Sequence, residues 1–196
     1  MGYRLVPLIL LAFAVGACGK EIGDSCNISA DCDPNGTRFC DPPQTSKDGY
    51  CTIQGCDYST CPDEAACIRF FTGSFSNKTC NPAEEPDQCN PQTESCCSLD
   101  ELCAIDGHCA PHASEVRFCM RKCNSDGDCR DGYECRDIAQ MITDGGEPVL
   151  APGQVIDDQG RVVDPTQKDA SGNPTVKVIA SHPPKFCAIR PVVPTP

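Results

Sequence analysis

Cysteine is the residue of this chain with the most chemistry to offer, because its thiol can form disulfides or bind metal ions. Nineteen of the 196 residues are cysteines. A share near one in ten is typical of disulfide scaffolds and far above that of an ordinary cytosolic enzyme. Because nineteen is odd, a chain held by disulfides alone would leave one thiol without a partner. The count therefore predicts a disulfide framework and one cysteine with a separate role.

Metal binding is the competing use of clustered thiols. Structural zinc sites commonly combine two Cys-x2-Cys pairs, and this sequence has none. Its closest comparable pair, Cys119 and Cys123, is separated by three residues and has no matching second pair. We therefore predict that the cysteines form disulfides and that the chain has no metal site built from thiolates.

Acidic side chains offer one weak cofactor candidate. Asp126, Asp128 and Asp131 lie in an Asp- and Gly-rich run that is reminiscent of calcium loops. The run fails the EF-hand template, because Cys129 and Cys135 stand where the template needs Gly and Glu. A turn between disulfides explains the same residues without an ion. We therefore predict no cofactor, with Ca²⁺ at these three aspartates as the alternative.

The sequence lacks the motifs of common catalytic sites. His108 and His112 have the spacing of a helical metal pair, but Pro111 lies between them. There is no Gly-x-Ser-x-Gly elbow, no phosphate-binding glycine loop and no Cys-x-x-Cys redox motif. The net charge of −12 opposes contact with a nucleic-acid backbone. We expect neither an enzyme nor a nucleic-acid-binding protein.

Residues 1–17 have the composition of a secretory signal peptide. Arg4 is their only charge, and an apolar run follows from Leu5 to Ala17. This run is too short to span a bilayer comfortably and contains Pro7. Export to an oxidising compartment would allow the disulfides to form.

The segment ends in Val15-Gly16-Ala17-Cys18-Gly19, which resembles the lipobox of bacterial lipoproteins. The resemblance implies cleavage before Cys18, a diacylglycerol on its thiol and an acyl chain on its new amino group. It also implies an outer-membrane address, read from Gly19, and a short lipidated tether at residues 18–25. Lipidation of Cys18 would leave an even number of cysteines for disulfides. The alternative is an ordinary signal peptide that is cut nearby.

The rest of the chain is too polar to fold on an apolar core alone. Leu, Ile, Val and Phe make up about 16% of residues 18–196, and a low share with high net charge is typical of disordered chains. Disulfides, at about 2–4 kcal/mol each, would supply the missing stability. We predict a small disulfide-rich fold of tandem cysteine-rich modules, with short β-hairpins, little helix and long loops.

One arrangement of four cysteines occurs twice, in a first module at residues 26–55 and a last module at residues 120–190. Each copy begins with Cys-Asn, has Asp directly before its second cysteine and an aromatic residue directly before its fourth. The Cys-x5-Cys-x5-Cys run of the last module, with Gly-Tyr-x-Cys at 132–135, resembles EGF-like and Dickkopf-like modules. In small cysteine-rich modules the first cysteine commonly bonds to the third and the second to the fourth. The implied pairs are Cys26–Cys40, Cys32–Cys51, Cys123–Cys135 and Cys129–Cys187.

Residues 56–119 form a central module with ten more cysteines, whose pairing the sequence leaves open. The six from Cys80 to Cys109 fit the order of a cystine knot. A bond between the adjacent Cys96 and Cys97 is disfavoured, because adjacent residues strain the bridge.

Three segments predict strands. Residues 68–75 hold the apolar cluster of the central module and predict a strand plus turn. In the cysteine-free insert at 136–186, residues 154–157 and 161–164 flank Gln159-Gly160 and predict a β-hairpin. Residues 175–179 predict another strand, and residues 191–196 a disordered tail.

Together these features favour a non-enzymatic, lipid-anchored protein of the cell outer membrane that presents disulfide-stabilised modules for binding or structural roles. Its expected partners are the membrane, through Cys18, and an unidentified protein or envelope component. The alternative is a secreted cysteine-rich inhibitor or ligand that acts through an inter-cysteine loop.

Overall fold

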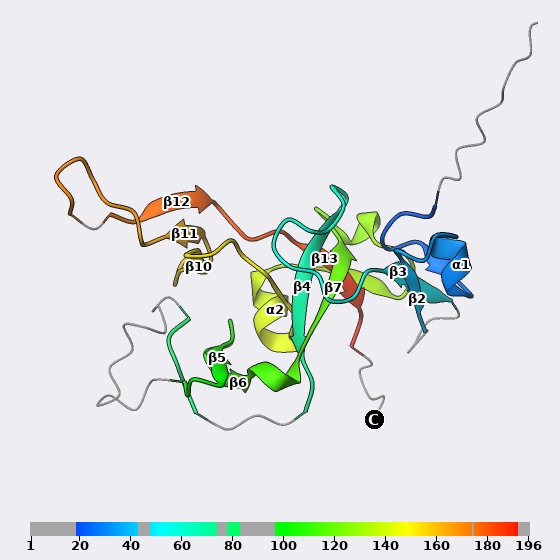
Figure 1. Cartoon of the computed structure of the whole chain (residues 1–196), viewed down its shortest axis with the longest axis horizontal. Coiled ribbons are helices and arrows are strands. Elements are labelled where there is room, and N and C mark those ends of the chain that lie inside the picture. The colour runs from blue at the N-terminus through cyan, green and yellow to red at the C-terminus, as the bar shows by residue number, and fades with distance from the viewer. Residues whose placement is uncertain (1–18, 43–47, 74–77, 83–96, 174, 192–196) are drawn as a thin grey trace, which may run out of the picture.

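The computed structural model describes residues 19–42, 48–73, 78–82, 97–173 and 175–191 (Figure 1). These residues form short strands in small antiparallel sheets, together with two short α-helices. Within these described ranges, eight disulfides join sixteen cysteines. The prediction of a small disulfide-rich fold with little helix is confirmed.

The disulfides fall into four units, and every unit joins its first cysteine to its third and its second to its fourth. The first and last units contain the four pairs that small cysteine-rich modules imply. A central unit and a nested unit, which lies inside the central one, repeat the same order. Their pairs are Cys56–Cys67 and Cys61–Cys119 in the central unit, and Cys80–Cys103 and Cys97–Cys109 in the nested unit.

A β-hairpin forms the base of every unit, with the third and fourth cysteines directly opposite each other. Opposite residues of an antiparallel pair have side chains on the same face. Both disulfides of a unit therefore cover one face of its hairpin, and the residues next to these cysteines point to the other face. The opposed cysteines are Cys40 and Cys51, Cys67 and Cys119, Cys103 and Cys109, and Cys135 and Cys187.

In the first unit a single helical turn crosses the hairpin. The preceding residues pack on this unit as well, since Ile22 is 0% exposed and the Gly23 amide donates to the Cys51 carbonyl oxygen at 2.9 Å. The segment predicted as a tether is thus largely docked on the folded body. The elements are β1 (Ser25–Cys26), α1 (Ser29–Cys32), β2 (Phe39–Asp41) and β3 (Gly49–Thr52).

The central unit forms a hairpin of two seven-residue strands in the middle of the molecule (Figure 1). Its strands are β4 (Ala65–Phe71) and β7 (Glu115–Arg121), and β9 (Glu147–Pro148) pairs with the other edge of β4. The strand predicted at 68–75 is confirmed as far as Phe71, and Phe75 lies outside the described residues. The linker from the first unit runs along β7, where the Cys119 amide donates to the Ile53 carbonyl oxygen at 2.9 Å.

The nested unit contains β5 (Glu101–Cys103) and β6 (Cys109–Pro111), followed by a 3-10 turn, η2 (His112–Ser114). Cys97 bonds to Cys109, which agrees with the expectation that Cys96 and Cys97 do not bond to each other. The bond from Cys80 to Cys103 also departs from knot order, which would join Cys80 to Cys97. Cys89 and Cys96 lie outside the described residues.

The last unit pairs β8 (Tyr133–Arg136) with β13 (Phe186–Ile189), after a 3-10 turn, η3 (Asp126–Asp128). Between these strands the insert holds a second sheet, which lies away from the first unit (Figure 1). The hairpin predicted around Gln159-Gly160 and the strand predicted near 175–179 are both confirmed. They are β10 (Val155–Ile156), β11 (Val162–Asp164) and β12 (Lys177–Ala180).

The helix α2 (Ile138–Asp144) in this insert was not among the predicted elements. Its start is capped by Asp137, whose carboxylate accepts the amides of Ala139 and Gln140 at 3.0 and 3.2 Å. Met141 is 1% exposed and packs with Phe186 and Ile68 in an apolar cluster. No helix within the described ranges is long and apolar enough to cross a membrane.

Candidate functional site

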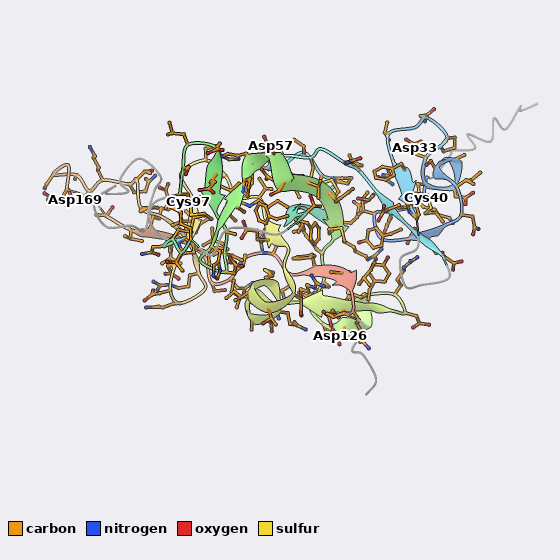
Figure 2. All side chains as sticks on the ribbon, turned by 90° about the horizontal axis from the view of Figure 1, so that it is seen from below. Asp33, Cys40, Asp57, Cys97, Asp126 and Asp169 are labelled. Carbon is orange, nitrogen blue, oxygen red and sulfur yellow. A yellow bond between two sulfur atoms is a disulfide. The ribbon has the colours of Figure 1, made fainter. Side chains whose placement is uncertain are left out.

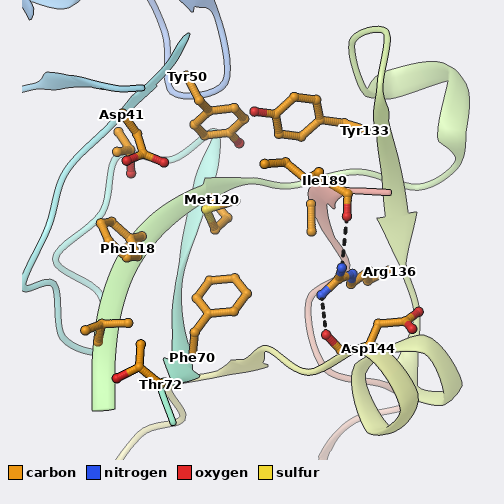
Figure 3. A pocket seen from close by; sticks show the side chains of 13 residues that line it. Asp41, Tyr50, Phe70, Thr72, Phe118, Met120, Tyr133, Arg136, Asp144 and Ile189 are labelled. Atoms are coloured by element: carbon orange, nitrogen blue, oxygen red, sulfur yellow. Dashed lines mark hydrogen bonds between the residues drawn. The ribbon is translucent and has the colours of Figure 1, made fainter. Parts of the chain in front are cut away.

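The candidate functional site is a pocket of about 510 Å³ where the first, central and last units meet (Figure 3). Small-molecule sites typically occupy about 300–1,000 Å³. The pocket lies among β2 and β3, β4 and β7, and β8 and β13. Its lining residues are Asp41, Tyr50, Thr52, Phe70, Thr72, Val116, Phe118, Met120, Tyr133, Arg136, Asp144, Ala188 and Ile189.

Equivalent positions of the three units line this pocket. Thr52, Met120 and Ala188 each follow the fourth cysteine of their unit, and Tyr50 and Phe118 each precede it. Side chains alternate along a strand, so the residues beside a disulfide cysteine point away from the disulfide. Each hairpin therefore turns its disulfide-free face toward a shared centre.

Stacked aromatic rings join the first and last units at one end of the pocket. The rings of Tyr50 and Tyr133 lie 5.1 Å apart with an interplanar angle of 23°. The Arg130 guanidinium lies 4.6 Å from the Tyr133 ring centre, and its Nη1 donates to the Gly49 carbonyl oxygen at 2.8 Å. The Tyr50 hydroxyl accepts the Arg121 amide at 2.9 Å, and burial raises the pKa of this hydroxyl. The Tyr50 ring is thus held in place by its stacking and by this hydrogen bond.

Phenylalanine rings form another part of the wall. Phe70 lies 6.5 Å from Phe118, and both rings are tilted relative to each other. Phe70 also meets Phe186 edge to face at 6.0 Å, which ties β4 to β13. Such aromatic pairs contribute about 0.5–1.5 kcal/mol beyond their buried area.

Arg136, the basic residue that lines the pocket, has its guanidinium hydrogen-bonded to the protein itself. Arg136 Nη1 donates to the carbonyl oxygens of Asp144 and Gly145 at 3.0 and 2.7 Å. Its Nη2 donates to the Ile189 carbonyl oxygen at 3.0 Å (Figure 3). Its Nε lies 3.4 Å from a Glu134 carboxylate oxygen. Arg136 therefore closes the last unit around α2 instead of offering a free guanidinium.

Asp41, unlike Arg136, is a charged lining residue whose side chain has no partner among the described residues. It is half-buried on the pocket wall, and its carboxylate makes no hydrogen bond or ion pair with the described part of the chain. Its cross-strand neighbour is Tyr50, and Figure 3 shows it on the same side of the pocket as Phe118. Partial burial raises the pKa of the Asp41 carboxyl. Among the described residues, the pocket thus combines apolar and aromatic walls with two carboxylates that have no polar partner, the half-buried Asp41 and the exposed Asp144.

The residues singled out as a calcium candidate have structural partners. The Asp128 carboxylate accepts the amides of Asn124 and Ser125 at 2.8 and 3.0 Å. Asp126 accepts the Cys135 amide at 2.9 Å, and its other oxygen lies 3.2 Å from Arg190 Nη2.

Asp131 is exposed, and it does not form a cluster of ligand atoms with the other two aspartates. Figure 2 places Asp126 at the edge of the molecule. In the described ranges, groups of three potential metal ligands consist of cysteines, and every one of these cysteines is in a disulfide.

Cys18, the predicted lipidation site, lies outside the described residues. Its neighbour Gly19 packs closely on the first unit, because a Cβ there would lie 2.8 Å from the Cys32 carbonyl oxygen. Lys20 Nζ donates to the Ser25 carbonyl oxygen at 2.6 Å. The folded body therefore begins directly after the cysteine that would carry the lipid.

Sequence reasoning did not find the pocket. One part of its signal was visible, since an aromatic residue precedes the fourth cysteine in the first and last units. The same pattern, Phe118-Cys119, ends the central unit, but its cross-strand neighbour Cys67 lies 52 residues earlier, beyond the nested unit.

Comparisons with known proteins found no matching family model, no matching curated protein and no matching solved structure.

Proposed function

We propose that this protein is a non-enzymatic, lipid-anchored protein of the cell envelope that binds a ligand in the pocket between its three main disulfide units. The observation that carries the binding role is the convergence of three hairpins on one cavity. Each hairpin contributes the residue that follows its fourth cysteine, and together they enclose about 510 Å³. A purely structural spacer would have no need of such a cavity.

Cysteine parity supports the anchor. Sixteen of the nineteen cysteines are paired among the described residues, and the other three are Cys18, Cys89 and Cys96. Three thiols can form at most one bond with each other, so at least one has another fate. The lipobox resemblance gives that fate to Cys18. Multiple acyl chains would give stable anchoring, which a single chain does not provide.

The docked segment after Cys18 predicts how the anchored protein would sit. Ile22 is 0% exposed, and Gly19 lies against the Cys32 backbone. A lipid on Cys18 would therefore hold the first unit at the bilayer surface, with the last unit and its insert extending from it. The outer membrane follows from the lipobox resemblance and the residue at position 19.

The anchor is tested by metabolic labelling with radioactive palmitate. The wild-type chain should incorporate label, and Cys18→Ala should lose it and accumulate as unprocessed precursor. Cys96→Ala, a cysteine change outside the lipobox, should keep the label. Intact mass before and after reduction should report the acyl chains and the disulfides together. Label in Cys18→Ala, or an unmodified chain released into the medium, would exclude the anchor.

The insert of the last unit supports a second candidate, a secreted inhibitor or ligand. β12 lies at the edge of its sheet, and three apolar side chains near it are exposed, namely Val176 at 63%, Val178 at 48% and Ile179 at 43%. An exposed apolar edge strand can pair with an extended chain. Inhibition of a protease from a test panel, lost in Val178→Lys but kept in Ile142→Lys at another exposed apolar site, would favour this candidate.

A further inference from the structure

The charged groups that line the pocket between the first, central and last units differ in whether they have a partner in the protein. Its lining cation, Arg136, already donates to three backbone carbonyl oxygens and lies beside Glu134. Asp41, in contrast, has no polar partner in the part of the chain that the structure describes. The described lining therefore offers an unpaired carboxylate and no unengaged cation, which favours a positively charged ligand over an anion.

The walls beside Asp41 suit the same kind of ligand. Tyr50 and Phe118, which lie around Asp41 in Figure 3, present aromatic surfaces. Aromatic faces attract organic cations, and the attraction grows when the cation is desolvated. Further into the pocket, Met120 and Ile189 offer apolar surface without a charge.

The charge of the whole molecule acts in the same direction. With 28 acidic and 16 basic residues, the chain repels anions and attracts cations at long range. Asp144, the second carboxylate on the pocket wall, is exposed and adds to this preference.

We propose that this pocket binds a small organic ammonium ion, with the ammonium group on Asp41 and the apolar part of the ligand among Phe118, Met120 and Ile189. The proposal deepens the binding role proposed above and does not depend on the lipid anchor. It identifies the ligand as a primary amine on an apolar body.

The test uses the mature chain with Cys18→Ser, exported behind an ordinary cleavable signal peptide, so that neither a lipid nor an uncleaved leader holds it in the membrane. Calorimetric titrations compare three probes of similar size: phenethylammonium, 3-phenylpropanoate and 3-phenylpropanol. Phenethylammonium should bind, the neutral alcohol should bind at least tenfold more weakly, and the carboxylate should not bind.

Two variants locate the binding. Asp41→Asn should weaken phenethylammonium binding roughly tenfold or more, because the amide keeps an acceptor oxygen but removes the negative charge that pairs with the ammonium. Val116→Phe should weaken binding of both the amine and the alcohol, because the larger side chain fills the cavity. Asp158→Asn is the matched control, since it removes the same charge from an exposed turn between β10 and β11. Non-reducing peptide maps should be unchanged in all three.

Each outcome decides the proposal. Amine binding that is lost in Asp41→Asn and kept in Asp158→Asn supports it. Amine binding unchanged in Asp41→Asn, a preference for the carboxylate or the alcohol, or no binding of the amine at millimolar concentration would overturn it. A preference for the alcohol, abolished by Val116→Phe, would leave a binding pocket with a neutral ligand, so the broader binding role would survive. Loss of the lipid anchor in the labelling experiment would affect neither result.

Discussion

At the scale of single residues, the aspartate before the second cysteine has the same role in the first and last units. The Asp31 carboxylate accepts the amides of Asn27 and Ile28 at 2.8 and 3.2 Å, and Asp128 accepts those of Asn124 and Ser125. These side-chain bonds satisfy the amides at the start of a helical turn.

In the central unit, a threonine instead of an aspartate accepts one backbone amide at the equivalent position. Thr60 stands before its second cysteine, and its hydroxyl accepts the Asp57 amide at 2.8 Å. The position thus calls for a short side chain with an oxygen acceptor, and aspartate is one solution.

Asp128 should therefore contribute to stability in a pH-dependent way. The amides of Asn124 and Ser125 lower the pKa of its carboxyl, so its stabilisation is present above the ordinary aspartate pKa and is lost as the pH falls through the lowered pKa. Asp128→Ala should lower the thermal midpoint at neutral pH, and the gap to wild type should close in acid. Thermal unfolding from pH 7 to pH 2 measures this. An equal effect of Asp131→Ala, an exposed aspartate nearby, would contradict it.

The pKa of the Glu147 carboxyl is shifted in the opposite direction from that of Asp128. It is 3% exposed, pairs with Arg69 Nε and accepts the Ile105 amide, which holds the turn of the nested unit against β4 and β9. Burial raises the pKa of its carboxyl despite the nearby guanidinium. A raised pKa in the folded state means that the protonated form is the favoured one, so stability falls as the pH rises through the raised pKa.

Glu147→Gln imitates the protonated form and should remove this pH dependence. As the pH falls below neutral, the thermal midpoint of wild type should rise relative to that of Glu147→Gln. Hydrogen exchange at the Ile105 amide gives the local readout, because the substituted side chain retains an acceptor oxygen for it. A difference between the two midpoints that stays constant from pH 7 to pH 4 would refute this account of Glu147.

At the scale of elements, the recurring component is a hairpin with two disulfides on one face. Two of these disulfides, Cys61–Cys119 and Cys129–Cys187, each span 58 residues, whereas Cys26–Cys40 spans 14. A disulfide restricts the unfolded chain more when the loop that it closes is longer. The long bridges should therefore matter most to stability.

Replacing both Cys129 and Cys187 with alanine should cost about 4 kcal/mol, against about 3 kcal/mol for the Cys26 and Cys40 pair. Urea unfolding under non-reducing conditions measures both values. A cost below about 1 kcal/mol for the long bridge would mean that the unfolded chain is already restricted by the remaining disulfides.

The sequence predicted the first and last units because their cysteines are close and share the Cys-Asn and Asp-Cys signature. It did not reveal the central and nested units, since the chain between Cys67 and Cys119 contains a complete second unit. Local spacing cannot display a bond that skips over another unit. Helix α2 was predictable in principle, because Asp137 with Gln140 forms a capping box.

At the scale of the whole molecule, contacts between hairpins replace a conventional apolar core. The largest buried cluster contains six cysteines, with Tyr50 and Tyr133 linking the first unit to the last. The pocket arises from the same contacts. It could not be predicted from the sequence, because it depends on how three separate hairpins pack and not on any local pattern.

The Tyr50–Tyr133 stack should couple the first and last units energetically. Tyr50→Leu and Tyr133→Leu should be non-additive, with a coupling energy of about 1 kcal/mol in a double-mutant cycle. Urea unfolding of the two single variants and the double variant gives this value. Tyr50→Leu combined with Val178→Ala, an exposed residue of the insert outside the stack, provides a reference cycle between unconnected sites. Strict additivity for the tyrosines would mean that the units fold independently.

Because the third and fourth cysteines lie opposite each other, the segment between them can vary in length without disturbing the hairpin. The third cysteine of each unit and the fourth, its cross-strand neighbour, are separated along the chain by 5, 10, 51 or 51 residues in the four units. Closing a longer loop costs little extra entropy, and cross-strand neighbours keep its ends about 5 Å apart whatever it contains. The nested unit is itself an example of a folded segment accommodated in this way. For protein engineering, the short Cys103–Cys109 connection is thus a natural graft point for an epitope or a reporter domain.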